Sequence, residues 1–338
     1  MRIIITGFGA VGQNLAKILR DESERFVHSY GFKPSIVAVS DSRGYCIDEN
    51  GLDLITLLKT KEGHGTVARY PGKGEKDAGT KSIINEVEAE VLVEATPTNF
   101  HDGEPGLSNI KTALASGKHV VTTNKGPLAV AMPALLELAQ HKDLRFRFSG
   151  TVGAGTPFLD FANKCLASDS ITGVRGILNG TTNYILTRME EGSVTLKKAL
   201  SEAQTRGYAE ADPTNDLEGL DTAAKVVIIA NWVLKRHVSL KDLEITGVNK
   251  ISPEWLRKAR KNRKKVKLIG SLDQSIASVK LEEVSLTDPV CVPGIMNALS
   301  YSTLHTGQVT LIGPGAGGAQ TASAVIRDLV DIRGEYIA

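Results

Sequence analysis

Residues 2–19 of the chain read RIIITGFGAVGQNLAKIL. The β-branched residues before the first glycine predict a strand, and the amphipathic residues after the last glycine predict a helix. Between them, Gly7, Gly9 and Gly12 have the GxGxxG spacing of a dinucleotide-binding turn. Because a strand leads into this turn and a helix leaves it, the segment predicts an α/β fold with a Rossmann-type, doubly wound parallel sheet.

Each glycine of this turn has a physical task in holding a dinucleotide. Gly7 allows the tight turn, Gly9 lets the backbone approach the pyrophosphate, and Gly12 lets the helix pack closely on the strand. The pyrophosphate then accepts hydrogen bonds from the free N–H groups at the start of the helix. We therefore predict that the cofactor contacts Gly7, Gly9, Ala10, Val11 and Gly12.

The end of the next predicted strand, residues 35–40, bears on the choice between NAD and NADP. An acid there usually hydrogen-bonds the adenosine ribose of NAD, whereas a nearby arginine accommodates the 2′-phosphate of NADP. This chain has both, Asp41 and Arg43. The cofactor is therefore NAD or NADP, with a slight preference for NADP unless Arg43 is only a solvent-facing turn residue. Residues 59–80, rich in glycine and charge, predict exposed and mobile structure beside the nucleotide.

Two further strands of this sheet are predicted to end in polar residues. Residues 89–96 predict a buried strand that ends at Thr96, and residues 117–125 predict the fifth strand, which ends at Lys125. Ligands bind at the carboxyl ends of the strands in an open parallel sheet. Thr96 is therefore a predicted cofactor contact, and Lys125 is predicted to point toward the nicotinamide. The alternative for Lys125 is a lysine that only caps the strand end, with its head group in water.

Residues 203–225, AQTRGYAEADPTNDLEGLDTAAK, predict the end of one helix, an acidic loop and the start of a second helix. Gly207 is placed to end the first helix, because glycine adopts the left-handed conformation without strain. On the second helix Asp221 and Lys225 are four residues apart and share a face. They form an ordinary surface ion pair or, because the apolar residues that follow predict a buried helix, part of a site for a cationic group. Four carboxylates of this segment could bind the ammonium group of a substrate, namely those of Glu210, Asp212, Asp216 and Asp221.

A second turn, Asn179-Gly180-Thr181, follows a predicted strand at residues 174–178. Thr181 is predicted to cap the helix that runs to Met189, and the free N–H groups at the start of that helix would hold a carboxylate. Together with the acidic loop, Gly180 and Thr181 would complete a pocket for an amino acid. The alternative is a plain capped helix without a ligand.

The composition argues against several classes of partner. The 338 residues include 40 Lys and Arg against 38 Asp and Glu, so no net charge favours nucleic acid or a membrane surface. No apolar run has the length of a membrane-spanning helix. The most basic run, residues 256–267, lacks aromatic residues and predicts a solvated helix face rather than an RNA site. Cys46, Cys165 and Cys291 are scattered, without CxxC spacing, and predict reduced thiols in a cytoplasmic protein.

The segment at residues 203–225 resembles, residue for residue, the signature of homoserine dehydrogenases. The run Thr123-Asn124-Lys125 is also similar to that family, and the resemblance covers essentially the whole chain. It implies the reversible conversion of L-homoserine and NAD(P)+ to L-aspartate 4-semialdehyde and NAD(P)H, in threonine, methionine and isoleucine biosynthesis. The positions that match the signature are Ala203, Gly207, Asp212-Pro213, Asp216-Leu217, Gly219, Asp221 and Lys225.

The resemblance also implies roles for individual residues. Lys125 and Lys225 are expected to take part in proton transfer, with Lys225 the proton donor in the reductive direction. If the two ammonium groups face each other, each lowers the pKa of the other toward neutrality. Beyond the contacts already given, the cofactor would reach Gly207 and Gly317. The residues expected to bind the substrate are Gly180, Thr181, Glu210, Asp216 and Asp221.

Residues 150–157, GTVGAGTP, resemble a loop of that family that binds a monovalent cation. The implied ligands for Na+ or K+ are the backbone carbonyls of Val152, Ala154 and Thr156. A glutamate ligand is expected as well, but its position is occupied by Ser149. The loop is therefore a cation site without its charged ligand, or only a hinge between domains.

The expected organisation has two domains. Residues 1–150 and 305–338 would form the dinucleotide-binding domain, and residues 151–304 would form an inserted α+β domain for substrate binding, catalysis and dimerisation. The resemblance implies a homodimer built on the sheet of the second domain. It also implies a short form of the enzyme, with no kinase domain before Met1 and no regulatory module after Ala338.

Two other interpretations stay open. An aspartate-semialdehyde-type dehydrogenase would share the cofactor and the aldehyde but needs an activated thiol. None of the three cysteines lies in a glycine-rich or catalytic-looking turn. A non-catalytic NAD(P)H sensor would keep the glycine motifs and need neither Lys125 nor Lys225.

Overall fold

The computed structural model describes residues 1–76, 79–273 and 276–334, and the chain divides into two compact units. Unit 1 comprises Met1–Thr151 and Gly317–Ala338, and unit 2 comprises Val152–Ala316. The chain therefore leaves the first unit and returns to it. The return falls at Gly317, later than the sequence-based boundary at residue 305, because residues 308–314 form a strand of the second unit's sheet.

Unit 1 is built on a seven-stranded sheet with the order β4-β3-β2-β1-β5-β6-β7. The five strands from β2 to β7 in this order are parallel, whereas β3 and β4 are antiparallel additions at one edge. Strand β1 lies between β2 and β5, so the strand order reverses beside it, which is where doubly wound sheets bind ligands. The strands are β1 (Arg2–Thr6), β2 (Ser35–Asp41), β3 (Gly44–Ile47), β4 (Gly74–Lys76), β5 (Val91–Glu94), β6 (His119–Thr122) and β7 (Phe146–Arg147).

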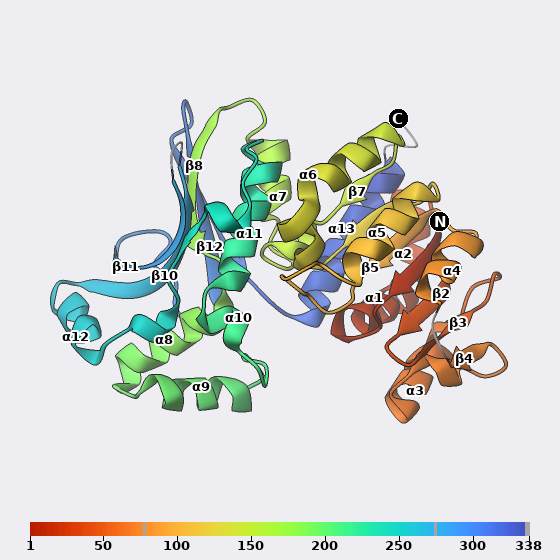
Figure 1. Ribbon diagram of the computed structural model, residues 1–338, viewed down its shortest axis with the longest axis horizontal. Coiled ribbons are helices and arrows are strands. Elements are labelled where there is room, and N and C mark those ends of the chain that lie inside the picture. The colour runs from red at the N-terminus through yellow and green to blue at the C-terminus, as the bar shows by residue number, and fades with distance from the viewer. Residues whose placement is uncertain (77–78, 274–275, 335–338) are drawn as a thin grey trace. The chain divides into compact units, whose positions relative to one another are not determined.

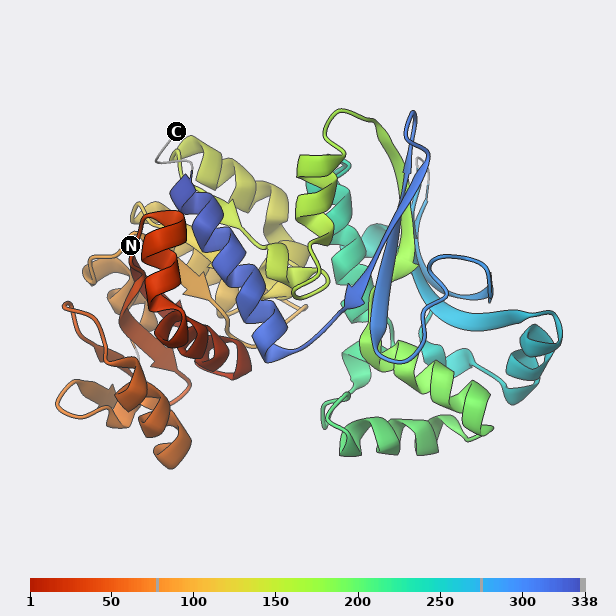
Figure 2. The same cartoon turned by 180° about the vertical axis from the view of Figure 1, so that it is seen from behind.

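Helices cover both faces of this sheet. Figure 1 shows α5 and α6 over one face, and Figure 2 shows α1 and α13 side by side over the other. The central strands are accordingly apolar on both faces; Ile3, Ile4 and Ile5 of β1 are all fully buried. The helices are α1 (Ala10–Asp21), α2 (Ser23–Tyr30), α3 (Leu54–His64), α4 (Thr80–Glu86), α5 (Gly106–Ala115), α6 (Lys125–His141) and α13 (Gly318–Gly334).

One expectation about unit 1 is wrong. Lys125 does not end the fifth strand, because β6 ends at Thr122 and Lys125 is the first residue of α6. The expectation for residues 59–80 is confirmed in part, since most of residues 59–76 are exposed, and their mobility stays a prediction. These residues contain the end of α3, a short 3-10 helix and β4, and they also bury Val67 and Tyr70; residues 77–78 lie outside the described residues.

Unit 2 is built on a six-stranded sheet with the order β13-β12-β8-β10-β11-β9. Neighbouring strands are antiparallel except for β9, which is parallel to β11. The strands are β8 (Ile171–Ile177), β9 (Glu244–Ile245), β10 (Lys264–Leu272), β11 (Ala277–Ser285), β12 (Met296–Thr303) and β13 (Gln308–Pro314).

One face of this sheet packs against α7 and α11. A Cβ added to Gly270 of β10 would lie 2.8 Å from Val226 of α11, so the helix rests directly on the strand. The Tyr301 hydroxyl of β12 donates to the Phe158 carbonyl of α7 at 2.7 Å. The helices of unit 2 are α7 (Phe158–Asp160), α8 (Gly180–Gly192), α9 (Leu196–Thr205), α10 (Thr214–Leu217), α11 (Leu220–Trp232) and α12 (Pro253–Lys261), with a π-helix at Phe161–Cys165. No helix within the described residues has the length and apolar character needed to cross a membrane.

The basic run at residues 256–267 is not one solvated helix face. It divides between α12 and the start of β10. Lys267 at its end is only 1% exposed. Its ammonium donates to Asn183 Oδ1 at 2.7 Å and to Thr187 Oγ1 at 3.2 Å, both on α8. The prediction fails at Lys267 because its burial depends on contacts with α8, whose residues Asn183 and Thr187 lie 84 and 80 positions away in the chain.

Candidate active site

The glycine turn between β1 and α1 has the geometry that a bound pyrophosphate requires. Gly7 has a φ of 90°, and a Cβ there would lie 2.4 Å from the Ala95 carbonyl, so only glycine fits. A Cβ at Gly12 would lie 2.8 Å from the Gly7 carbonyl oxygen. Gly9, by contrast, has no described neighbour within 4 Å of where its Cβ would be. The turn is therefore tight at both ends and open in the middle, where a phosphate would approach the start of α1.

The second glycine-rich segment returns to the same place. A Cβ on Gly318, the first residue of α13, would lie 3.1 Å from the Ala10 carbonyl oxygen at the start of α1. Gly317 has a φ of 126°, which favours glycine. The beginnings of α1 and α13 are therefore adjacent within unit 1. This juxtaposition sets Gly317 beside the first glycine turn, although more than 300 residues of chain separate them.

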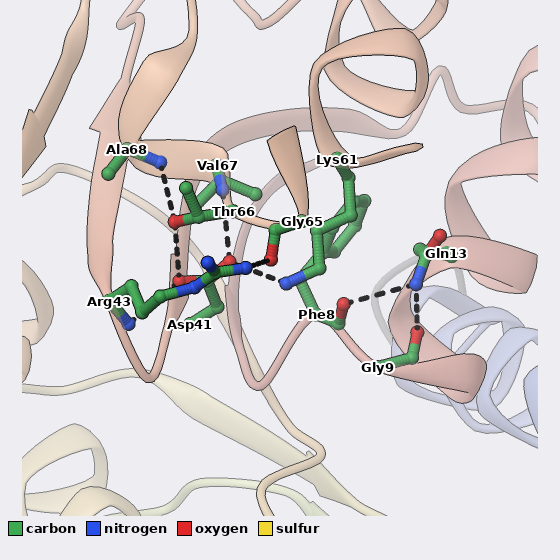
Figure 3. Close-up of polar contacts among 10 residues, drawn as sticks. All are labelled: Phe8, Gly9, Gln13, Asp41, Arg43, Lys61, Gly65, Thr66, Val67 and Ala68. Atoms are coloured by element: carbon green, nitrogen blue, oxygen red, sulfur yellow. Dashed lines mark hydrogen bonds and ion pairs between the residues drawn. The ribbon is translucent and has the colours of Figure 1, made fainter. Parts of the chain in front are cut away.

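Asp41 at the end of β2 is already saturated with hydrogen bonds (Figure 3). Oδ1 accepts from the Arg43 N–H at 2.9 Å and the Thr66 hydroxyl at 3.0 Å. Oδ2 accepts from Lys61 Nζ at 2.6 Å and the Val67 N–H at 2.9 Å. Burial raises the pKa of this carboxyl, but these hydrogen bonds outweigh burial and hold the pKa below its ordinary value. Asp41 therefore anchors the segment after α3 and has little capacity left for a ribose hydroxyl.

Two cations flank Asp41 in the same region. Arg43 follows the strand and donates from its guanidinium to the Gly65 carbonyl, as Figure 3 shows. Lys61, on α3, reaches Asp41 and is mostly buried. Sequence reasoning missed Lys61, because 20 residues separate it from Asp41 and its only local signal is membership in a charged helix. Arg43 and Lys61 together give the end of β2 a positive character.

Thr96 and Lys125 are linked through Asn124. The Asn124 side-chain amide donates to Thr96 Oγ1 at 3.2 Å. Asn124 is also the N-cap of α6, since its Oδ1 accepts from the Gly126 N–H at 3.0 Å. Lys125 therefore occupies the first turn of a helix that starts at the carboxyl end of the sheet. Lys125 belongs to unit 1 and Lys225 to unit 2, and their mutual approach stays a prediction.

In unit 2 the predicted pair on α11 is present and enclosed. Lys225 Nζ lies 2.7 Å from Asp221 Oδ2 and also donates to the Leu178 carbonyl at 2.6 Å. The Lys225 side chain is only 7% exposed, so the reading as an ordinary surface pair is wrong. The residues after Lys225, which form the buried stretch of α11, hold it at this depth.

Asn179 joins this pair to the acidic loop. Its side-chain amide donates to Asp216 Oδ1 at 2.6 Å and to Asp221 Oδ2 at 2.9 Å. Its Oδ1 accepts from the Thr182 N–H at 2.8 Å, so Asn179 is the N-cap of α8. Thr181 is therefore not the cap; its hydroxyl donates to the Tyr208 carbonyl at 2.7 Å instead. The sequence signal for Asn179 was its turn position, but its two carboxylate partners lie too far along the chain to be inferred.

Gly180 and Glu210, predicted to bind the substrate, and Gly207, predicted to contact the cofactor, have three different settings in unit 2. Gly180 lies against the Ile295 carbonyl, which is 2.7 Å from where a Cβ would be. Gly207 follows α9 with a φ of 73°, as predicted for a helix-ending glycine, and no described atom lies within 4 Å of its Cβ position. Glu210 is exposed, and its backbone carbonyl accepts from the Gln204 side chain at 3.2 Å.

The three carbonyls predicted to hold a cation, those of Val152, Ala154 and Thr156, lie in a compact turn at the start of unit 2. Gly153 and Ala154 both have positive φ, 83° and 50°. The Thr156 carbonyl already accepts from the Phe158 N–H at 2.8 Å. No cluster of His, Cys, Asp and Glu suited to a metal occurs in the part of the chain that the structure describes. The loop therefore offers backbone oxygens alone.

None of the cysteines with a shifted pKa has the setting of a nucleophile. Cys46 is fully buried, and burial raises the pKa of its thiol to about 12. Burial also raises the pKa of Cys291. Both thiols are therefore less ionised than a free cysteine, which is the opposite of what an aspartate-semialdehyde-type mechanism requires.

Comparison with known proteins agrees with this geometry. The family model described as homoserine dehydrogenase matches residues 157–330, and the model described as glutamate/leucine/phenylalanine/valine dehydrogenase matches residues 1–104. The homoserine dehydrogenase of Methanocaldococcus jannaschii is 42% identical over 333 residues, 98% of each chain.

Two further relatives bear on the cofactor. The NAD(+)-dependent homoserine dehydrogenase of Pseudomonas canavaninivorans is 40% identical over 338 residues, covering 98% of this chain and 96% of that one. A hyperthermophilic archaeal homoserine dehydrogenase solved in complex with NADPH has a TM-score of 0.87 and 29% identity, covering 99% of this chain and 98% of that one. Both dinucleotides thus occur among proteins similar to this chain.

Proposed function

The chain belongs to the homoserine dehydrogenase family, and from this premise we propose how its residues perform the NAD(P)-dependent interconversion of L-homoserine and L-aspartate 4-semialdehyde. The observation that carries the proposal is the enclosed Lys225–Asp221 pair with Asn179 and Asp216 around it. A bound nicotinamide dinucleotide supplies the hydride acceptor, or the hydride donor in reverse. The protein has to hold the substrate and move one proton.

Lys225 is the proton donor to the substrate oxygen in the reductive direction. An ammonium group has three protons, and Asp221 and the Leu178 carbonyl take two of them. The third is left for the oxygen that becomes the homoserine hydroxyl. Asp221, 2.7 Å from Nζ, fixes the direction of the Lys225 ammonium group. Lys125 acts with Lys225 in proton transfer.

The substrate's two charged groups have separate binding sites in unit 2. Its ammonium is bound by Asp216, Asp221 and Glu210, the acidic groups beside the lysine. Its carboxylate is bound at the start of α8, where Asn179 takes the Thr182 N–H and no described hydrogen bond uses those of Gly180 and Thr181. A zwitterionic amino acid would thus be oriented by opposite charges at its two ends.

The cofactor occupies the first glycine turn, with Gly7, Gly9, Ala10, Val11 and Gly12 around the pyrophosphate. Thr96, Lys125, Gly207 and Gly317 are the further contacts. NADP is preferred over NAD, because Asp41 is engaged with Lys61 while Arg43 and Lys61 supply positive charge for a 2′-phosphate. Comparing kcat/KM for NAD and NADP tests this preference directly.

Two finer features complete the proposal. A monovalent cation, Na+ or K+, would bind the carbonyls of Val152, Ala154 and Thr156. Comparing the activity in choline buffer with that in sodium and potassium buffers tests for it.

The chain forms a homodimer through the sheet of unit 2. On β13 of that sheet, Ile312 is 50% exposed, and Leu304 beside the β12–β13 hairpin is 64% exposed. Light scattering of the wild type and of Ile312→Lys gives the oligomeric state.

Homoserine oxidation is the deciding experiment. The wild type should produce NAD(P)H absorbance with L-homoserine, and Lys225→Ala should abolish it while nucleotide binding persists. Nucleotide binding without turnover in the wild type would contradict the dehydrogenase function and favour an NAD(P)H sensor.

A further inference from the structure

Three polar residues lie side by side at the carboxyl ends of three central strands in unit 1. Glu94 ends β5, and in the sheet it is paired with Thr6 of β1 on one side and Thr122 of β6 on the other. All three are fully buried. The rest of β5 is Val91, Leu92 and Val93, so Glu94 is the single charged residue of an otherwise apolar strand. A buried carboxyl at this edge of a doubly wound sheet requires a physical reason.

Glu94 accepts hydrogen bonds with both of its carboxylate oxygens. Oε1 accepts from the Thr96 N–H at 3.0 Å and from the Thr96 hydroxyl. Oε2 accepts from the Thr122 hydroxyl at 3.2 Å. Asn124 then donates to both hydroxyl oxygens, from its N–H to Thr122 at 3.0 Å and from its side chain to Thr96 at 3.2 Å.

Glu94 is the acceptor at the base of this network. A hydroxyl has one proton to donate; Thr96 donates it to the Glu94 carboxylate, and Thr122 donates it to Glu94, whose backbone carbonyl and Oε2 both lie 3.2 Å from the Thr122 Oγ1. Each hydroxyl oxygen is then left as an acceptor, for the Asn124 N–H at Thr122 and for the Asn124 side-chain amide at Thr96. Asn124 in turn caps α6, whose first residue is Lys125. Glu94 is thus connected to Asn124 through two successive hydrogen bonds, and Lys125 is the next residue of the chain.

The start of α5 packs against the same network. A Cβ on Gly106 would lie 2.6 Å from Asn124 Nδ2 and 3.1 Å from Glu94 Oε2, so the helix start can come this close only with glycine. The positive end of the helix dipole therefore lies next to the carboxylate. Glu94 forms no ion pair within the described residues. Burial raises the pKa of its carboxyl, while hydrogen bonds from Thr96, Thr122 and Asn124 oppose the rise.

We propose that Glu94 is a positioning residue for hydride and proton transfer: its buried carboxylate sets Thr96 and Asn124, and through Asn124 the first turn of α6 that carries Lys125. The proposal rests on the proposed function, since Thr96 and Lys125 are the residues at the nicotinamide. It adds a residue that touches neither substrate nor cofactor. When Glu94 is protonated, its carboxyl group donates a hydrogen bond to the hydroxyl of Thr96 or Thr122 instead of accepting one. The hydrogen bonds that position Asn124 are then rearranged, and kcat falls at acid pH.

The test compares the wild type with Glu94→Gln, which has nearly the same shape but offers an amide donor toward Thr122. Measured are kcat, KM for homoserine, NAD(P)H affinity by fluorescence titration, and the pH dependence of kcat between about pH 5.5 and 9. We expect kcat to fall on the order of ten- to a hundredfold, as for a small misplacement of catalytic groups. KM for homoserine should change less than about twofold, because its binding groups are in unit 2. The part of the wild-type acid limb that Glu94 causes should be absent from the variant, whose remaining acid limb comes from the lysine that accepts the substrate proton in homoserine oxidation.

A matched control is Asp328→Asn, an acid-to-amide change at a carboxylate that is 2% exposed in the same unit. Asp328 lies on α13 and accepts from the Ser149 hydroxyl at 2.6 Å and from the Ser149 N–H at 3.0 Å, rather than from Thr96, Thr122 or Asn124. Its kcat profile should keep the acid limb even if its melting temperature falls. If Glu94→Gln does not fold, Thr122→Val removes one of the two hydroxyls that join Glu94 to Asn124, and should also lower kcat.

The outcomes separate the two proposals. Absence of homoserine turnover in the wild type defeats the proposed function itself. If the wild type turns over and Glu94→Gln has the same kcat and the same pH profile, Glu94 is a structural residue and the positioning role is overturned. Equal losses of stability and activity in Glu94→Gln and Asp328→Asn, with both acid limbs intact, overturn it as well.

Discussion

Lys225 Nζ lies 2.7 Å from Asp221 Oδ2, one turn earlier on α11, and the two side chains are 7% and 13% exposed. An ion pair at this depth is held in one geometry, because α11 is buried around it and Asn179 donates to the same carboxylate oxygen. The third proton of the Lys225 ammonium group, which neither Asp221 nor the Leu178 carbonyl accepts, therefore points in one fixed direction. This is the property expected of a proton donor rather than of a surface ion pair.

Lys225→Met should lower kcat by at least about a hundredfold, the usual contribution of a positioned proton donor. NAD(P)H affinity should stay within a few-fold of the wild type, because the dinucleotide turn is in unit 1. The measurement is steady-state homoserine oxidation together with a fluorescence titration of NAD(P)H. Lys235→Met serves as the control, since Lys235 contacts Trp232 near the end of α11 and has no predicted role. A Lys225→Met enzyme with near-normal kcat would remove Lys225 from the mechanism.

Asp221→Asn should destabilise the protein by about 3 kcal/mol or more, because it leaves the buried Lys225 ammonium without its counter-charge. The control is Glu254→Gln, which breaks the Glu254–Arg257 pair of α12; both side chains there are more than two-thirds exposed. Such a surface pair contributes about 0.5 kcal/mol at most. Urea unfolding of the three proteins measures both changes, and equal losses would mean that depth does not matter here.

Local patterns in the sequence predicted much of this molecule, and for physical reasons. The glycine turn, the helix end at Gly207 and the i, i+4 pair on α11 each depend on residues within one or two turns of chain. Their geometry follows from backbone conformation and helical spacing. These features were predicted and are present.

What the sequence did not predict depends on contacts between distant segments. Asn179 meets Asp216 and Asp221 across 37 and 42 residues, and Lys61 meets Asp41 across 20. Lys267 could not be recognised as buried, because its burial depends on contacts with α8. Lys125 was misplaced because Asn124 ends the extended chain by capping a helix, and a capping asparagine is also common in turns.

Arg43→Ser should lower kcat/KM with NADP by roughly tenfold, the effect of one lost charge-assisted hydrogen bond. With NAD the change should be small, because there is no 2′-phosphate for Arg43 to meet. The readout is the ratio of kcat/KM for the two dinucleotides. Arg20→Ser is the control, because Arg20 pairs with the adjacent Asp21 at the exposed end of α1. A ratio that is unchanged in Arg43→Ser would mean that Arg43 is only a turn residue.

Lys267 should make stability depend on pH in the alkaline range. The pKa of its ammonium is lowered from 10.5 to about 8, chiefly by burial; Lys265 adds to the shift, and Cys291, Glu190 and Glu191 oppose it. Between these two values the unfolded chain holds a proton that the folded chain has lost. The free energy of unfolding therefore rises with pH in this window. The destabilisation of the folded protein by the buried charge is fully present below about pH 8.

This pKa shift corresponds to a destabilisation of the folded protein on the order of 3 kcal/mol at neutral pH. In Lys267→Met this pH-dependent rise should vanish, although losing the hydrogen bonds to Asn183 and Thr187 offsets part of the gain at neutral pH. Urea unfolding of both proteins at about pH 7 and pH 10 gives the change in unfolding free energy with pH for each protein. Subtracting the change in the variant from the change in the wild type isolates the contribution of Lys267, since the other alkaline groups titrate in both. Lys265→Met, whose side chain is 22% exposed and paired with Glu190, is the control and should keep the rise. If Lys267→Met keeps it too, the buried ammonium is not its source, and Lys267 is better solvated in the folded protein than its 1% exposure indicates.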